Sequence, residues 1–144
     1  MTQEDKELLF KDLCARLPYN VRVEYNGTTL TNIFDVLGIA HGRSVLCLPF
    51  MSKTECPLIE EVKPYLFPLL SMSEEQKNEL CRMDAFVNSF GQICFSTYDD
   101  YGHELMPTFE NAIRVENWFN KNHFDYRGLI EKGLAIDATG LNIY

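Results

Sequence analysis

The first hydrophobic positions of the chain recur at helical spacing. Thr2 and Asp5 are three residues apart, as in a capping box that opens a helix, and Pro18 marks its end. The apolar side chains between them lie three or four positions apart: Leu9, Phe10, Leu13, Cys14 and Leu17. The pattern predicts an amphipathic helix over residues 3–17.

Strand-like alternation follows the first helix. Val21, Val23 and Tyr25 alternate with polar residues, and Asn26-Gly27 suits the two positive-φ positions of a type I′ turn. A β-hairpin over residues 20–33 is therefore predicted. Its register places Tyr25 opposite Thr28 and Val23 opposite Leu30, because this pairing keeps the apolar side chains on one face.

The middle of the chain has a weaker pattern. Residues 33–39 fit either a continued strand or a short helix, and Val45–Leu48 is a short apolar run that favours a buried strand. In residues 57–70 three prolines interrupt an apolar stretch, which predicts irregular backbone or short helical turns. The stretch is too apolar for an interdomain linker, so a packed connector is favoured.

Two further helices are predicted in the second half. Ser73 with Gln76 forms a capping box for a helix over residues 73–86, and Thr108 is placed to cap a helix over 109–122. Between them, residues 91–98 alternate like a strand and 99–103 form a turn, and residues 134–136 suggest a last short strand. On the 109–122 helix the apolar side chains span roughly 220°, so it is expected to contact more than one neighbour, or a partner.

These elements define the expected fold class. We expect a single α+β domain over residues 1–144, with an antiparallel sheet that includes the 20–33 hairpin and three packed helices. The composition agrees, since 144 residues that are 46% hydrophobic suffice for one core. The elements lack the regular β-α-β alternation of a doubly wound sheet.

The charge narrows the range of partners. The net charge is −8, with acidic residues spread from Glu4 to Asp137. A negative field repels nucleic-acid phosphates and anionic lipid, so neither nucleic acid nor a membrane is expected as a partner. One alternative stays open: an acidic inhibitor that mimics nucleic acid, which requires carboxylates aligned on one face.

The location of the protein and the state of its cysteines are both inferred from what the sequence lacks. The first residues lack the apolar core of a signal peptide, and no stretch has the roughly 18 apolar residues of a membrane span, so a cytoplasmic protein is expected. The cysteines are widely separated and form no C-x-x-C pair, so they are interpreted as small buried hydrophobic residues: Cys14, Cys47, Cys56, Cys81 and Cys94.

Catalytic signatures are sparse. The three histidines, His41, His103 and His123, lie far apart in sequence, and a hydrolase-like enzyme would need one of them beside a Cys, Ser or carboxylate in a cleft. His103 with Asp99 and Asp100 lacks the spacing of a known metal loop, and no phosphate-binding glycine pattern occurs. No cofactor, no metal and no catalytic residue is predicted.

The segment Trp118–Ile130 combines the only tryptophan with His, Asp, Tyr and Arg. In a structural interpretation, Trp118, Phe119 and Phe124 fill the core, Asp125 caps the backbone or pairs with Arg127, and Gly128 permits a turn. In a functional interpretation, the outward-facing members bind a partner, because these residue types dominate interface energetics. The candidate partner-binding residues are Trp118, His123, Tyr126 and Arg127.

Two blocks of the chain resemble a known group of proteins. Residues 117–138, which contain the run HFDYRGLIEKGLAI, and residues 64–75, PYLFPLLSMSEE, are similar to blocks of uncharacterised small proteins common in gut bacteria and in their phages and mobile elements. The resemblance implies membership of such a group and no particular reaction.

Together these observations favour a non-catalytic accessory protein of phage or mobile-element type. It is expected to act through protein–protein interaction, with a different protein or its own copy as partner. The hydrolase-like enzyme that uses His, Cys and Asp residues, and the acidic inhibitor, remain as alternatives.

Overall fold

The computed structural model describes residues 1–30, 36–40, 43–47 and 57–144, with side chains for 1–30 and 57–144. Its helices and strands follow the chain in this order: α1 (Gln3–Arg16), β1 (Val23–Tyr25), β2 (Thr28–Leu30), β3 (Val36–Ala40), β4 (Arg43–Cys47), β5 (Val62–Leu66), α2 (Glu74–Cys81), β6 (Ala85–Val87), β7 (Ile93–Phe95), α3 (Phe109–Lys121) and β8 (Ile136–Asp137). The predicted α+β class is confirmed.

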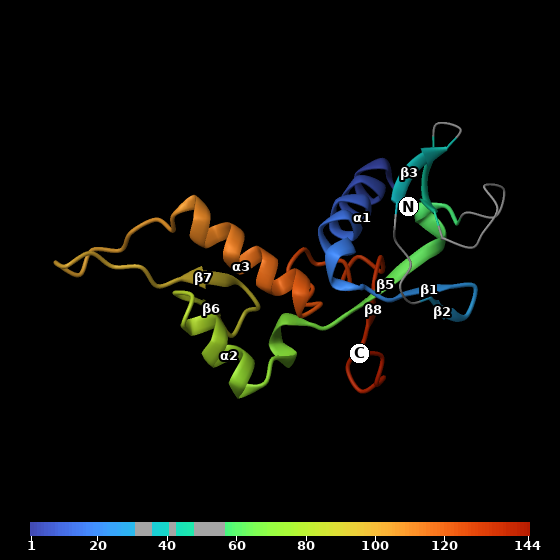
Figure 1. Cartoon of the computed structure of the whole chain (residues 1–144). Coiled ribbons are helices and arrows are strands. Elements are labelled where there is room, and N and C mark those ends of the chain that lie inside the picture. The colour runs from blue at the N-terminus through green and yellow to red at the C-terminus, as the bar shows by residue number, and fades with distance from the viewer. Residues whose placement is uncertain (31–35, 41–42, 48–56) are drawn as a thin grey trace.

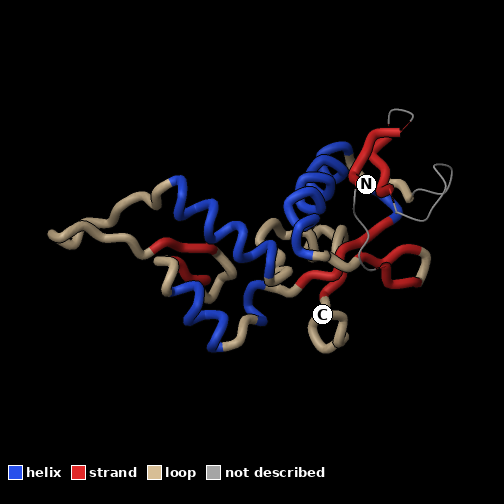
Figure 2. Tube along the Cα trace, viewed as in Figure 1, coloured by secondary structure: helices blue, strands red, loops and turns tan. Residues whose placement is uncertain are grey.

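The elements gather at two ends of the molecule. Figure 1 shows α1 and the strands β1, β2, β5 and β8 at one end, and α2, α3, β6 and β7 at the other. The chain between β7 and α3 projects beyond the second of these ends, away from α1 and the sheet, and Figure 2 shows this extension as loop throughout. Among the described residues, no helix has the length and apolar character needed to cross a membrane.

The first helix forms as its sequence predicts. Thr2 accepts from the Asp5 backbone N–H at 3.1 Å, and the Asp5 carboxylate accepts from the Thr2 N–H, which completes the capping box. These hydrogen bonds from Thr2 lower the pKa of Asp5. Leu9 and Leu13 are fully buried against the sheet. The helix ends at Arg16, one residue before the predicted boundary, and Pro18 lies in the 3₁₀ turn that follows.

The predicted hairpin is confirmed in type and register. Val23 pairs with Leu30 and Tyr25 with Thr28, and Asn26 and Gly27 both have positive φ, at 50° and 77°. Residues 31–33 of the predicted range lie outside the described residues. The hairpin is one edge of a four-stranded sheet of order β2-β1-β5-β8, which is antiparallel except for the parallel pairing of β5 with β8.

The middle of the chain is described in part. β3 and β4 pair as an antiparallel hairpin. β4 confirms the strand predicted for Val45–Leu48 as far as Cys47, and Leu48 lies outside the described residues. The segment that was open between strand and helix is a strand over residues 36–39, and residues 33–35 lie outside.

The irregular backbone predicted for residues 57–70 is wrong at its centre, where β5 forms between two 3₁₀ turns. Pro64 lies inside this central strand. The Tyr65 N–H donates to Arg22 O at 2.9 Å, and successive amides point to opposite sides of a strand, so the Pro64 nitrogen faces away from β1. On that side β8 begins opposite Tyr65, so no ladder bond is lost at Pro64. The segment is packed, as predicted, with Val62 and Leu66 fully buried.

The second predicted helix is too long. The Ser73–Gln76 capping box is present, but α2 ends at Cys81 and residues 85–87 form β6 instead. Asp84, at φ 55°, turns the chain, and β6 then pairs with β7, the strand predicted within residues 91–98. Pairing with β7 satisfies the backbone of a short apolar run, so tertiary context overrides local helix propensity here.

α3 confirms the predicted 109–122 helix to within one residue, since it ends at Lys121, and it confirms the Thr108 cap. Its apolar side chains form two groups. Val115 and Phe119 are buried in the cluster that joins α2, β6, β7 and α3. Toward the start of the helix, Phe109 and Ile113 are exposed, and Phe109 keeps 82% of its surface in water. The apolar side chains of the later turns of α3 thus pack in the core, whereas those near its start are exposed to solvent.

A buried ion pair joins α1 to the end of α3. Arg16 and Asp12 have no exposed side-chain surface, and Arg16 Nε donates to Asp12 Oδ2 at 2.7 Å. The same guanidinium donates to the backbone oxygen of Phe124 at 2.8 Å and lies 3.5 Å from that of Phe119. Asp12 also accepts from Arg127 at 2.9 Å. Asp12 therefore binds two arginines, and Glu116 supplies a second carboxylate to Arg127.

Replacing Asp12 tests this junction. Asp12→Ala leaves Arg16 buried without its counter-ion, so the free energy of unfolding should fall by about 3–5 kcal/mol in urea denaturation. Glu74→Ala removes an exposed pair with Lys77 and should cost under about 1 kcal/mol. Equal, small losses in the two variants would contradict the role assigned to Asp12.

Candidate functional site

The end of α3 has a specific cap that positions the Trp118–Ile130 segment. His123 adopts a left-handed conformation at φ 58°, and its N–H donates to Asn120 O. The next N–H, of Phe124, donates to Phe119 O at 3.0 Å, and the two rings pack edge to face. This is a Schellman motif with histidine in the position that glycine usually occupies.

Backbone bonds then join this segment to the chain after β5. Phe67 N–H donates to His123 O at 2.9 Å, and Asp125 N–H donates to Phe67 O at 2.8 Å. Residues 64–75 and 117–138, the two blocks that carry the resemblance, therefore lie side by side. We name residues 123–130, together with Phe67, the corner. Neither block forms the corner alone.

Asp125 acts on the backbone within the corner. Its two carboxylate oxygens accept from Leu129 N–H at 2.9 Å and Ile130 N–H at 2.7 Å. Gly128, at φ 71°, allows the turn between them. The capping role proposed for Asp125 is confirmed, whereas the alternative pairing with Arg127 is wrong, because Arg127 binds Asp12 and Glu116 instead.

The polar heads of Tyr126 and Arg127 are used inside the chain. The Tyr126 hydroxyl lies 2.9 Å from Glu116 Oε1 and 3.0 Å from Asn120 Oδ1, and burial raises its pKa. Arg127 binds Glu116 at 2.7 Å and covers the Tyr126 ring at 4.4 Å. Both side chains hold the segment after α3 against the helix.

Trp118 connects two helices. Its ring stacks on Phe124 at 5.7 Å, and its Nε1–H donates to Glu79 of α2 at 3.0 Å. The structural interpretation of Trp118, Phe119 and Phe124 as packing residues is therefore confirmed. The partner-binding role of Trp118, His123, Tyr126 and Arg127 stays a prediction, and their main contacts are internal.

His123 lies in a desolvated position. Only 8% of its surface is exposed, and its ring stacks on Tyr144 with centroids 3.9 Å apart. Burial, with Arg16 and Arg22 nearby, lowers the pKa of His123 to about 4, although Asp12 acts in the opposite direction. Its Nδ1 has no hydrogen-bond partner within the described part of the chain.

The other candidate catalytic groups do not meet at a cleft. His103 Nδ1 lies 2.9 Å from Asp99 Oδ2, but on an exposed turn, and His41 lies outside the described residues. No three His, Cys, Asp or Glu side chains in the described residues form a metal-binding group.

The cysteines differ in burial. Cys14 and Cys94 are partly buried, and burial raises the pKa of the Cys14 thiol. Cys81 is exposed, so the buried interpretation is wrong there. The side chains of Cys47 and Cys56 lie outside the description.

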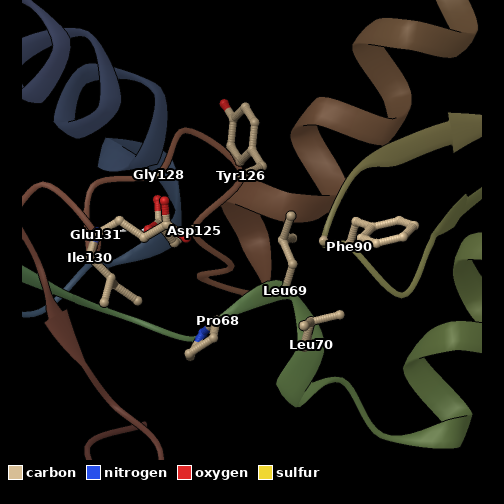
Figure 3. Close-up of a pocket in the computed structure, with 10 residues that line it drawn as sticks. Pro68, Leu69, Leu70, Phe90, Asp125, Tyr126, Gly128, Ile130 and Glu131 are labelled. Atoms are coloured by element: carbon tan, nitrogen blue, oxygen red, sulfur yellow. Dashed lines mark hydrogen bonds between the residues drawn. The ribbon is translucent and has the colours of Figure 1, made fainter.

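A groove of about 350 Å³ lies beside the corner (Figure 3). The segment from Pro68 to Leu70 lines one side, and the chain from Asp125 to Glu131 lines the other. Its lining contains no Lys, Arg, His, Cys or Ser, and the Asp125 carboxylate already accepts two backbone N–H groups. The groove therefore combines apolar surface with one exposed carboxylate, that of Glu131, and has no nucleophile of the Ser or Cys type.

Among the residues whose side chains the structure describes, the extension between β7 and α3 is the most exposed apolar segment. We name residues 96–108, together with Phe109 and Glu110 of α3, the acidic arm. Tyr101 and Met106 keep 87% and 88% of their surface in water, and the arm's other exposed apolar residues are Tyr98, Leu105 and Phe109. Sequence reasoning missed this surface, although its exposed side chains lie within fifteen consecutive residues.

Internal bonds order the arm. The Thr97 hydroxyl donates to the backbone oxygen of Leu105 at 2.7 Å, and the Leu105 N–H donates to the backbone oxygen of Thr97, also at 2.7 Å. At the tip, Asp99 accepts from the backbone N–H groups of Tyr101 and His103 and from the His103 ring. These bonds, those of His103 first, lower the pKa of Asp99. The predicted 99–103 turn is confirmed.

The charge of the arm is entirely acidic apart from His103. Between Arg82 and Arg114 the sequence contains no Lys or Arg, and it contains five acids: Asp84, Asp99, Asp100, Glu104 and Glu110. This gap in positive charge is the sequence signal that marks the surface. It combines aromatic side chains with negative charge.

Comparisons with family models, with curated proteins and with solved structures find no match to this chain.

The environment of His123 predicts a pH dependence. Its pKa is about 4 in the folded chain against an ordinary 6.5, so between these values the unfolded chain binds more protons. Stability should therefore fall as the pH drops from about 6.5 to about 4, by about 3 kcal/mol from this group. His123→Asn tolerates positive φ and should flatten this part of the pH profile in urea denaturation.

His103→Asn is the control, because His103 lies on an exposed turn away from His123, so this variant should keep the fall in stability between pH 6.5 and 4. Parallel pH profiles for His123→Asn and the unmodified protein would contradict the assignment.

Proposed function

We propose that this protein is a non-catalytic binding protein that docks a basic protein through the acidic arm. The observation that supports this most strongly is the exposure of Tyr101, Met106 and Phe109 on a segment that extends from the body of the molecule. Aromatic residues and Met are enriched in the buried centres of interfaces. Large apolar side chains that are exposed within one short segment are typical of interaction sites.

The charge of the arm favours a basic partner. Asp100, Glu104 and Glu110 lie among the apolar residues along the sequence, and the arm contains no Lys or Arg to balance their charge. A second copy docked arm to arm would bring these carboxylates together, which is unfavourable. Complementary positive charge on a different protein would instead accelerate association and fix orientation.

The remaining inferences from the sequence belong to this proposal. They are a cytoplasmic location and an accessory role in a phage or mobile element. We prefer the binding protein to the nucleic-acid mimic because Asp99 is used within its own turn and aromatic side chains, rather than a row of carboxylates, dominate the arm. No described histidine combines with a nucleophile in a cleft to favour the hydrolase-like enzyme.

Photo-crosslinking from the arm identifies the partner. The crosslinking amino acid p-benzoylphenylalanine replaces Tyr101 in one variant and Phe90 in another, because Phe90 is an aromatic of similar exposure, at 84%, outside the arm. In host cells, position 101 should capture a basic protein that position 90 does not. Equal capture at both positions would contradict an arm-specific site.

The captured protein is then purified and titrated. Tyr101→Ser with Met106→Ser should weaken its binding at least tenfold, because exposed aromatic anchors contribute about 2 kcal/mol or more to an interface. Thermal stability should stay within about 0.5 kcal/mol, since both side chains are solvent-exposed. The matched control, Leu70→Ser with Phe90→Ser, removes exposed apolar surface elsewhere and should bind normally. Unchanged binding by the arm variant would overturn the proposal.

A further inference from the structure

A tyrosine hydroxyl bridges β5 and the residue that precedes β1. Tyr65 N–H donates directly to Arg22 O at 2.9 Å, but the return bond of this pair is interrupted. Arg22 N–H donates to the Tyr144 hydroxyl at 3.1 Å, and that hydroxyl donates to Tyr65 O at 2.8 Å. The phenol satisfies one backbone donor and one backbone acceptor, as an inserted water would.

The ring of Tyr144 contacts residues from three parts of the chain, and 39% of the surface of Tyr144 stays exposed. His123, after α3, stacks on one face at 3.9 Å with an interplanar angle of 11°. Phe67, after β5, packs at 5.8 Å, and the Arg22 guanidinium, before β1, lies 5.6 Å from the ring centre. We name Arg22, Tyr65, Phe67 and His123 the phenol slot. Burial there raises the pKa of Tyr144 to about 12, so the hydroxyl stays protonated and able to donate.

The rest of this segment is held lightly. Residues 139–142 are exposed, and their backbone bonds are local, from Leu141 N–H to Ala138 O and from Thr139 N–H to Asp137 Oδ1. Beyond the ring, the segment is attached through Ile143, whose oxygen accepts from Arg22. We name residues 139–144 the strap. Few bonds to other described residues must break to release it, so its local opening requires less free energy than unfolding of the sheet.

We propose that the phenol slot is a recognition site for a para-substituted phenol. Tyr144 occupies the slot as an internal ligand, and when the strap opens, a phenol from another molecule takes its place. The chemistry is specific, because a ring without a hydroxyl leaves Arg22 N–H and Tyr65 O without the group that bridges them. Tyr144 competes at the high effective concentration of a tethered group, so the unmodified chain should bind free phenols far more weakly than a chain with an empty slot. This site is independent of the acidic arm.

The first test empties the slot. In Tyr144→Gly, p-cresol at millimolar concentration should raise the thermal midpoint by several degrees and with saturation, because a ligand of the folded state stabilises it. Toluene, which lacks only the hydroxyl, should produce less than a tenth of that shift. The unmodified protein should respond far less to p-cresol. The same measurement with N-acetyl-tyrosinamide and with a short tyrosine peptide distinguishes the two sources of the phenol. A larger shift with these compounds than with p-cresol indicates a tyrosine of another protein, and a smaller shift indicates a small free phenol.

A folded Tyr144→Gly variant that ignores p-cresol, or responds equally to toluene, would overturn the proposal. A second measurement decides the case in which that variant fails to fold. In native-state hydrogen exchange of the unmodified protein, the Arg22 amide should exchange at least tenfold faster than the Tyr65 amide, since only Arg22 depends on the strap. Tyr144→Phe, which keeps the ring, should increase that difference. Exchange of both amides only through global unfolding would show that the strap is not releasable.

Discussion

The buried Arg16 guanidinium is the interaction on which the rest of the structure depends. α1 contributes Arg16 and Asp12, and the corner after α3 contributes the backbone oxygens that the guanidinium binds. Hydrophobic packing alone specifies poorly how a helix is rotated against its neighbour, whereas a charged group with several directional bonds has one satisfied arrangement. Because an unpaired charge in this position is costly, the arrangement that satisfies Arg16 also sets where His123, Phe124 and Arg127 lie.

Local signals explain which elements were predicted from the sequence. The hairpin and all three helix caps depend on residues within a few positions of one another, and each formed as expected. β5 and β6 depend on partners far away in sequence. Pro64 argues against a central strand unless one knows that β8 begins opposite Tyr65, and residues 85–87 resemble helix until β7 is placed beside them. Local propensity contains neither fact.

The candidate site shows the same limit for side chains. Residue type made Trp118, Tyr126 and Arg127 plausible anchors, since the same types dominate interfaces and rigid corners. Orientation decides between those roles, and it depends on Asp12 and Glu116, which lie outside the segment. The acidic arm is the converse case. Its composition is visible in the sequence, but only the structure shows that Tyr101 and Met106 have nothing in the described chain to cover them.

The conformation of His123 links the end of α3 to the phenol slot. Glycine is the residue that a Schellman motif prefers at this position, and a side chain with positive φ costs about 1 kcal/mol. Histidine offsets that cost through its stack on Tyr144, which a glycine would lack. The choice of histidine at position 123 is therefore explained by its contact with Tyr144 and not by the backbone conformation that ends α3. Release of the strap removes the stack and leaves the strain, so the cap of α3 and the occupancy of the slot are energetically coupled.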